Sequence, residues 1–154
     1  MTFELTQDEG EYIVRLARRA AETYLTKRQI IKPPADAPPK LNEKCGVFVT
    51  INEVHGKSHQ LRGCIGLPYP TTMLAKAVIE SAISSAAQDP RFSPMKAEEL
   101  DQVVFEVSVL TPPEIVEVEK PRDYCKQIAV GRDGLIIDRS YCKGLLLPQV
   151  PVEL

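Results

Sequence analysis

Two strand-like runs joined by a short polar segment constrain the fold of this chain most strongly. Residues 46–52 (GVFVTIN) are rich in β-branched and aromatic side chains, which is typical of a β-strand. The polar residues 53–59 contain Gly56, which favours a chain reversal into the apolar run 61–65. We therefore predict a β-hairpin whose second strand contains residues 61–66, with the sequence LRGCIG.

The second strand of this hairpin carries a cysteine and an arginine two residues apart. In a regular strand alternate side chains share a face, so Arg62 and Cys64 are expected to project together. A neighbouring cation stabilises the thiolate, which is the nucleophilic form of cysteine. The competing interpretation is that Cys64 fills the core, since free cysteine is among the most buried residue types.

A third strand is predicted at residues 103–110 (VVFEVSVL), where apolar residues alternate strongly enough to indicate a central strand. Glu106 then lies on the more polar face of that strand, where it could be a carboxylate of a site. An exposed surface glutamate is the favoured interpretation, because buried carboxylates are rare.

Helices are expected on both sides of the hairpin in the sequence. A capping box at Thr6 and Glu9 begins an amphipathic segment that predicts a first helix of about six turns. Thr71 or Thr72 is expected to cap a second helix that runs to Ala87. Short antiparallel strands are predicted at 128–130, 135–138 and 144–148. Together these elements predict an α+β fold, an antiparallel sheet with flanking helices.

Length and composition limit the remaining possibilities. A chain of 154 residues fits one compact domain, in which the proline-rich residues 31–41 are expected to form an extended connector. The formal net charge of −2 provides no field that would attract nucleic acid. The N-terminus does not resemble a signal peptide, and no run approaches the ~20 apolar residues of a membrane span. We therefore predict a cytoplasmic protein with no membrane segment and with reduced cysteines.

Metal and nucleotide sites are not predicted. Cys45, His55, His59 and Cys64 are potential metal ligands, but the two histidines fall at the expected hairpin tip, where histidines are usually solvated. The segment 131–134 (GRDG) is typical of a turn, not of a nucleotide-binding loop.

The chain resembles the AMMECR domain family over essentially its whole length. The hexapeptide at residues 61–66 is the signature of that family. Further similar segments follow the family's order, at 46–50, 89–92, 106–111, 134–135 and 145–150. The resemblance implies an antiparallel sheet with helices packed around it, two unequal lobes and a cleft near the signature. Family members generally continue with a tryptophan and several tens of further residues, whereas this chain has no Trp, so we expect the family's C-terminal part to be missing.

One functional hypothesis is an enzyme whose site contains Arg62 and Cys64. Arg62 would stabilise the thiolate or hold an anionic group of a small substrate, and Glu106 or Arg91 would line the pocket. The resemblance implies a pathway shared with a radical-SAM protein and a Memo-like protein. The sequence specifies no reaction, substrate or cofactor.

The other hypothesis is a non-catalytic, regulatory module that binds a ligand or a protein. Gly63 and Gly66 would then permit close approach of the ligand or partner, Arg62 would bind an acidic group, and Cys64 would be packing. The pairing of a charge with a thiol on one face slightly favours the enzyme. The apolar residues 150–154 fit a partner surface, either an absent segment or a second subunit, and the oligomeric state stays open.

Overall fold

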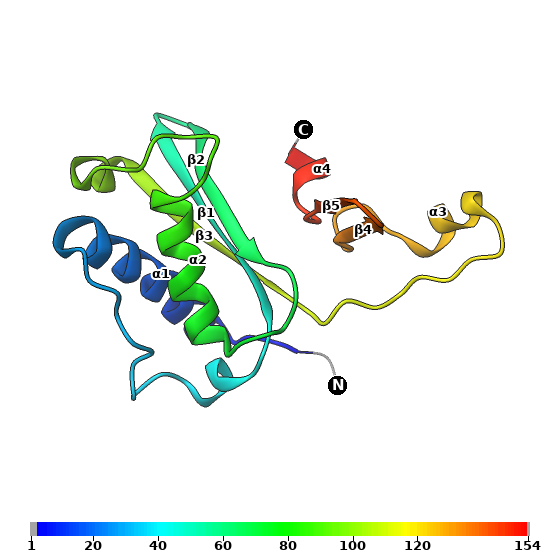
Figure 1. The fold of residues 1–154 in the computed structure, drawn as a ribbon, viewed down its shortest axis with the longest axis horizontal. Coiled ribbons are helices and arrows are strands. Elements are labelled where there is room, and N and C mark those ends of the chain that lie inside the picture. The colour runs from blue at the N-terminus through cyan, green and yellow to red at the C-terminus, as the bar shows by residue number, and fades with distance from the viewer. Residues whose placement is uncertain (1–2, 154) are drawn as a thin grey trace. The chain divides into compact units, whose positions relative to one another are not determined.

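The computed structural model describes residues 3–153, in two compact units of unequal length (Figure 1). The first unit is Met1–Pro112, which contains a three-stranded sheet, and the second is Pro113–Leu154, which contains a two-stranded sheet. Both sheets are antiparallel, and helices flank the larger one. The predicted fold class is therefore confirmed.

The sheet of the first unit is built on the predicted hairpin. Strands β1 (Gly46–His55) and β2 (Ser58–Leu67) pair antiparallel, and β3 (Val103–Leu110) pairs with the other side of β1. The strand order is β2-β1-β3. The prediction that residues 103–110 form a central strand is therefore wrong in this sheet, because β1 takes that place and β3 lies at an edge.

The first helix follows the predicted capping box. Helix α1 (Gln7–Lys27) begins after Thr6, whose Oγ1 accepts a hydrogen bond from the Glu9 N–H at 3.2 Å. The Glu9 carboxylate accepts one from the Thr6 N–H at 2.8 Å, and this bond lowers the pKa of Glu9. Two of the N–H groups left unpaired at a helix start are thus satisfied locally, which is why the sequence identified this end.

The second helix starts later than predicted. Helix α2 (Leu74–Ala87) follows Met73, and no side chain caps it, so neither Thr71 nor Thr72 is the cap. Met73 pairs with Lys44 in an isolated β-bridge, which keeps the chain extended up to the helix. The Leu74 N–H is satisfied by the Glu43 carbonyl at 2.8 Å instead of by a cap. This tertiary bond has no signature in the local sequence.

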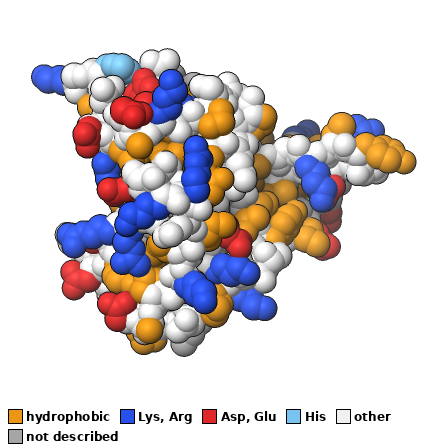
Figure 2. Space-filling view, turned by 60° about the vertical axis from the view of Figure 1, so that its left-hand side comes forward, with side chains coloured by type: hydrophobic (Ala, Val, Ile, Leu, Met, Phe, Trp, Pro, Cys, Tyr) orange, Lys and Arg blue, Asp and Glu red, His pale blue; other side chains and the backbone are white. Residues whose placement is uncertain are grey.

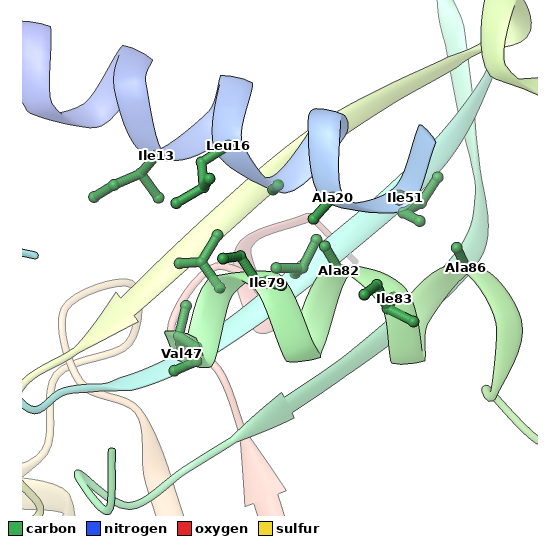
Figure 3. Packing of buried hydrophobic residues seen from close by; sticks show 14 of the residues in the cluster. Ile13, Leu16, Ala20, Val47, Ile51, Ile79, Ala82, Ile83 and Ala86 are labelled. Atoms are coloured by element: carbon green, nitrogen blue, oxygen red, sulfur yellow. The ribbon is translucent and has the colours of Figure 1, made fainter. Parts of the chain in front are cut away.

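The core of the first unit lies between the two helices and one face of the sheet. Alternate side chains of β1, Val47, Val49 and Ile51, are fully buried. Burying side chains of this size contributes about 1.5–3 kcal/mol each. In Figure 3 the apolar face of α1 meets that of α2 above β1, with Ile13, Leu16 and Ala20 opposite Ile79, Ala82, Ile83 and Ala86.

The second unit contains a β-hairpin over two of the short antiparallel strands predicted near the C-terminus. Strands β4 (Leu135–Arg139) and β5 (Cys142–Leu146) pair antiparallel. Short helices lie on either side of them in the sequence, α3 (Tyr124–Gln127) and α4 (Val150–Glu153). Three short 3₁₀ helices complete the two units, at Pro39–Asn42, Ala97–Gln102 and Pro121–Asp123.

The strand predicted at residues 128–130 does not form. The Ala129 carbonyl instead accepts hydrogen bonds from the N–H groups of Arg132 and Asp133, at 3.2 and 3.0 Å. The Asp133 carboxylate accepts one from the Ala129 N–H at 2.8 Å. These bonds close a turn, which uses the backbone groups that a strand would need for pairing.

Candidate functional site

A β-bulge interrupts strand β2 inside the signature hexapeptide. The hairpin register pairs Asn52 with Leu61 but pairs Ile51 with Gly63, so Arg62 is an extra residue in β2. An extra residue breaks the alternation of faces along a strand. The prediction that Arg62 and Cys64 share a face assumed a regular strand. Strand β2 is irregular at Arg62, so this assumption does not hold.

The bulge directs Arg62 into the protein, where acidic side chains hold it. Arg62 is 9% exposed, and its Nε donates to the Glu99 carboxylate at 2.8 Å. The Glu53 carboxylate lies 3.8 Å from the same nitrogen, and the guanidinium lies over the Phe92 ring. The hydrogen bond from Arg62 lowers the pKa of Glu99. Arg62 is thus a buried ion-pair partner, and buried cations require such pairing.

Cys64 lies on the face of the sheet opposite to the helices. It pairs with Thr50 across the hairpin, and the Thr50 Oγ1 is 3.2 Å from the Cys64 Sγ. Thr50 alternates along β1 with Val49 and Ile51, which are buried under the helices. Since Arg62 is held by Glu99 instead, the prediction that Arg62 and Cys64 share a face is wrong.

Glu106 is in the same row of side chains as Cys64. Thr50 pairs with Cys64 on one side and with Glu106 of β3 on the other. Neighbouring strands are about 4.8 Å apart, which puts the backbones of Cys64 and Glu106 about 10 Å from each other. Glu106 is exposed, as favoured from the sequence. The structure thus places both predicted residues on one face, with a threonine between them.

The arginine that hydrogen-bonds Cys64 is Arg91, and Asp89 positions it. Asp89 follows α2, and its side chain is 2% exposed. It accepts hydrogen bonds from the Arg91 Nε at 3.0 Å, the Arg91 Nη2 at 2.8 Å and the Cys64 N–H at 2.9 Å. The Arg91 Nη2 also donates to the Cys64 carbonyl at 3.2 Å. Cys64, Asp89 and Arg91 therefore form a closed ring of hydrogen bonds, which we call the Cys64 ring.

The charged groups of the Cys64 ring stabilise one another. Hydrogen bonds from Arg91 hold the pKa of the Asp89 carboxyl far below its ordinary value, and the N–H of Cys64 contributes to this effect. Asp89 in turn raises the pKa of Arg91, and the charge of a Cys64 thiolate adds to that rise. Arg91 remains about half exposed, with 54% of its side-chain surface accessible. A fixed cation with accessible surface thus lies beside the Cys64 backbone, close enough to interact with the charge of a Cys64 thiolate.

The signature glycines accommodate the protein's own backbone. A Cβ on Gly63 would lie 2.1 Å from the Ser85 carbonyl oxygen of α2, and one on Gly66 would lie 2.1 Å from the Val47 carbonyl oxygen of β1. The absence of side chains therefore lets α2 and β1 approach β2 closely.

A groove of about 300 Å³ lies between the last residues of β2 and helix α2. One wall is strand β2 and the other is helix α2. We call it the edge groove, and its lining residues are Ile65, Gly66, Leu67, Glu80, Ser81 and Ser84.

Across residues 3–153 no three side chains of His, Cys, Asp or Glu are grouped closely enough to hold a metal ion. His55 instead contacts the Glu53 carboxylate at 3.1 Å. None of the described helices combines the length and apolar character needed to cross a membrane. On the face in Figure 2, basic and acidic side chains are interspersed.

Sequence reasoning missed two residues of this region. Asp89 was identified only as part of a turn, although an aspartate two residues before an arginine is a local signal for such a contact. Thr50 gave no signal at all, because its contact with Cys64 depends on the register of the hairpin. Arg91 was identified as a binding residue, but not as the cation that hydrogen-bonds Cys64.

Comparison with known proteins places the chain in a set of archaeal relatives. A sequence model of the AMMECR1 family matches residues 14–154. The chain is 54% identical to Protein PH0010 of Pyrococcus horikoshii over 154 residues, covering 99% of this chain and 74% of that protein. It is 52% identical to a protein of Thermofilum pendens over 155 residues, covering 97% and 73%. With a protein of Methanothermobacter thermautotrophicus it shares 51% identity over 149 residues, covering 97% and 76%.

The fold is similar to that of a solved structure. The crystal structure of the uncharacterised protein PH0010 from Pyrococcus horikoshii matches with a TM-score of 0.92 and 54% sequence identity. The match covers 98% of this chain and 74% of that chain. Sequence and structure thus agree on the same relative.

Proposed function

The chain belongs to the AMMECR1 family, and from this premise and the geometry around Cys64 we propose that it is an enzyme for a small anionic substrate. Cys64 is the nucleophile, and Arg91 is the anchor for an oxygen of the substrate. Arg62 leaves the proposed site, because Glu99 and Glu53 already hold its guanidinium. The observation that carries the proposal is the Cys64 ring, which fixes a half-exposed guanidinium on the backbone of the cysteine.

The hydrogen bonds of Arg91 indicate how it would bind a substrate. Its Nε and Nη2 are engaged by Asp89 and by the Cys64 carbonyl. Within residues 3–153 no hydrogen bond engages Nη1, which can donate to a ligand oxygen. The negative charge of Asp89 offsets the positive charge of Arg91. The anchor therefore acts mainly through directed hydrogen bonds, and we expect its preference for anions to be severalfold.

Thr50 and Glu106 support the chemistry from the neighbouring strands. The Thr50 hydroxyl, 3.2 Å from the Cys64 Sγ, can donate a hydrogen bond to the thiolate. Glu106, beyond Thr50 in the same row, contributes an exposed carboxylate to the same face of the sheet. Gly63 and Gly66 contribute by letting the backbone pack closely behind Cys64.

Alkylation with a matched pair of reagents tests the proposal. Iodoacetate is anionic and iodoacetamide is neutral, so the ratio of their rates at Cys64 reports an anion anchor near the thiol. We expect Arg91→Gln to lower this ratio about threefold, which corresponds to the loss of one weak hydrogen bond. Arg132→Gln removes a comparable exposed arginine of the second unit and should leave the ratio unchanged. Cys142, an exposed cysteine, provides the reference rate in the same protein.

Two outcomes would contradict the proposal. A Cys64 that reacts only after unfolding cannot be a nucleophile. A ratio that is the same in wild type and Arg91→Gln would remove the anchor. Either result would favour the alternative function, a non-catalytic ligand- or protein-binding regulatory module in which Cys64 is packing. The partial burial of Cys64 against Thr50 is the observation that favours this alternative.

The wider context of the proposal comes from the family resemblance. A pathway shared with radical-SAM and Memo-like proteins stays a prediction, as do the cytoplasmic location and the reduced state of the cysteines. The organisation as one AMMECR-type domain over residues 1–154, with its connector at 31–41, also stays a prediction.

A further inference from the structure

The aromatic ring of Phe92 contacts the guanidinium groups of two arginines. The guanidinium carbon of Arg91 lies over the ring at 5.5 Å from its centroid, and that of Arg62 lies over it at 5.9 Å. Both distances are within the ~6 Å over which an aromatic face attracts a cation. Arg91 belongs to the Cys64 ring, and Arg62 belongs to the ion pair with Glu99. Phe92 therefore connects these two groups.

The Phe92 ring is itself held in place from two sides. The Arg62 Nε and Nη2 donate to the Glu99 carboxylate at 2.8 and 3.3 Å, so two bonds fix this guanidinium, and the arginine is 9% exposed. The Phe92 N–H donates to the Asp89 carbonyl at 3.1 Å, which closes a β-turn. A fixed cation and a closed turn thus restrict the position of the ring.

The contact between Arg91 and Phe92 depends on this turn. Consecutive side chains do not face each other in a regular helix or strand. Asp89 accepts hydrogen bonds from the Arg91 Nε at 3.0 Å and from its Nη2 at 2.8 Å. The donors of a guanidinium lie in its plane, so these bonds hold one edge of the group and allow the plane to tilt about that edge. The Phe92 ring contacts a face, where it opposes such a tilt.

We propose that Phe92 is a positioning residue for Arg91. This inference rests on the proposed function, in which Arg91 holds an oxygen of the substrate. Asp89 fixes the edge of the Arg91 guanidinium and Phe92 fixes its plane, so that the Nη1 donors keep one direction although the side chain is half exposed. Phe92 acts through Arg91 and does not bind the substrate itself.

Hydrogen exchange of the Arg91 side chain, followed by NMR, measures this effect without any use of Cys64. The Nε–H exchanges with water when its bond to Asp89 opens. We expect Phe92→Leu to speed this exchange about threefold, which corresponds to the loss of one cation–π contact at an exposed site. Phe92→Tyr retains an aromatic ring and should restore the rate of the wild type. Phe92→Met is a second non-aromatic variant, to be used if the leucine variant does not fold.

A second aromatic contact of the first unit provides the matched control. Phe105 lies under the guanidinium carbon of Arg18, which is 5.7 Å from the ring centroid. Phe105→Leu removes a ring of the same kind from the same unit, and we expect it to leave exchange at the Arg91 Nε–H unchanged. A general loosening of the unit would instead speed exchange in both leucine variants.

The ratio of iodoacetate to iodoacetamide rates at Cys64 connects the position of Arg91 with the site. Phe92→Leu should lower this ratio about twofold, less than Arg91→Gln does, because the arginine remains but is less well oriented. In the Arg91→Gln background, Phe92→Leu should have no further effect on the ratio. A merely structural role of Phe92 would change the two rates in parallel and leave their ratio constant.

The outcomes separate this inference from the proposed function. Unchanged exchange at Arg91 in Phe92→Leu, equal changes in the leucine and tyrosine variants, or an effect on the ratio that persists in the Arg91→Gln background would overturn the role of Phe92. A Cys64 that reacts only after unfolding, or a ratio that Arg91→Gln does not change, would overturn the proposed function. The exchange rates would then still report whether Phe92 holds Arg91.

Discussion

The Asp89–Arg91 pair of the first unit and the Asp133–Arg132 pair of the second have nearly the same local geometry. In both, the arginine Nε donates to the aspartate Oδ1 and the Nη2 to Oδ2, at 3.0 and 2.8 Å for Asp89 and at 2.9 and 2.6 Å for Asp133. Both aspartates have a lowered pKa, and that of Asp133 is about 2. The two pairs cannot be distinguished by their own bonds.

The backbone groups that the two aspartates bind are what separates them. Asp89 accepts from the N–H of Cys64, 25 residues away in β2, and its side chain is 2% exposed. Asp133 accepts from the N–H of Ala129, four residues away, and its side chain is 31% exposed. The first pair therefore joins two elements of the fold, whereas the second closes a turn. The same chemical unit acquires a different role from burial and from the sequence distance it spans.

The largest expected difference in stability is between alanine substitutions of two strand glycines, one in each unit. A Cβ on Gly63 of β2 would lie 2.1 Å from the Ser85 carbonyl oxygen, whereas one on Gly144 of β5 meets nothing within 4 Å. We expect Gly63→Ala to destabilise the protein by about 4 kcal/mol, because backbone must move to relieve the overlap. Gly144→Ala should change stability little. Urea unfolding followed by circular dichroism measures both.

Equal stability of the two alanine variants would contradict the close approach of α2 to β2. A Gly63→Ala protein that does not fold would agree with it. Gly63→Ser should then fold no better, since its Cβ meets the same carbonyl oxygen.

The two aspartates provide the next largest contrast. Asp89→Ala should cost about 3 kcal/mol, because it leaves the partly buried Cys64 N–H unsatisfied and removes charged hydrogen bonds to Arg91. Asp133→Ala removes bonds of similar length from an exposed turn, and we expect a clearly smaller loss. Urea unfolding at pH 7 gives the two values. If they are equal, burial does not decide the role of such a pair.

The stability supplied by Asp89 should depend on pH. Its pKa is lower in the folded protein than the unfolded value of about 3.9. Its contribution is therefore fully present above about pH 4 to 5 and decreases as the pH falls toward the folded pKa. The difference in unfolding free energy between wild type and Asp89→Asn should be larger at pH 7 than at pH 3. A difference that grows on acidification would contradict the charged role of Asp89.

Much of this fold could be predicted because its signals are local. The capping box of Thr6 and Glu9, the alternation in β3 and the composition of β1 each lie within a few residues of sequence. Local patterns failed where tertiary bonds determine an end, as for α2, whose first N–H is satisfied by the Glu43 carbonyl. They also failed at residues 128–130, where Asp133 stabilises a turn.

The candidate site was less predictable, because its geometry depends on register. The alternation rule assigned Arg62 and Cys64 to one face, and the bulge at Arg62 separates them. The arginine that does lie beside Cys64 is Arg91, 27 residues further along the chain. Sequence identified Cys64, Glu106 and Arg91 as candidates, but it could not show which of them the fold brings together.

Ser85 tests whether burial makes a satisfied hydroxyl stabilising. Its oxygen accepts from the Ile65 N–H and lies 2.7 Å from both the Val49 and the Ser81 carbonyl oxygens, although its single proton can serve only one of them at a time. We expect Ser85→Ala to lower the unfolding free energy by about 1.5 kcal/mol. Ser140 of the second unit has a positive φ, unlike the helical Ser85, and is therefore not a suitable control. Ser84→Ala, from an exposed bond on the same helix, is the control and should have little effect.

The smallest expected effect has the opposite sign and sharpens the comparison most. Ser81 is as buried as Ser85, but its hydroxyl has no partner within residues 3–153. If burial amplifies the consequence of each polar contact, it must also amplify the cost of a missing one. Ser81→Ala should therefore raise the unfolding free energy by about 1 kcal/mol in the free protein. Thermal unfolding of Ser81→Ala beside Ser85→Ala measures the two signs in one experiment. Loss of stability in both variants would mean that the two hydroxyls are equivalent, and that satisfaction of the hydrogen bond does not decide the effect.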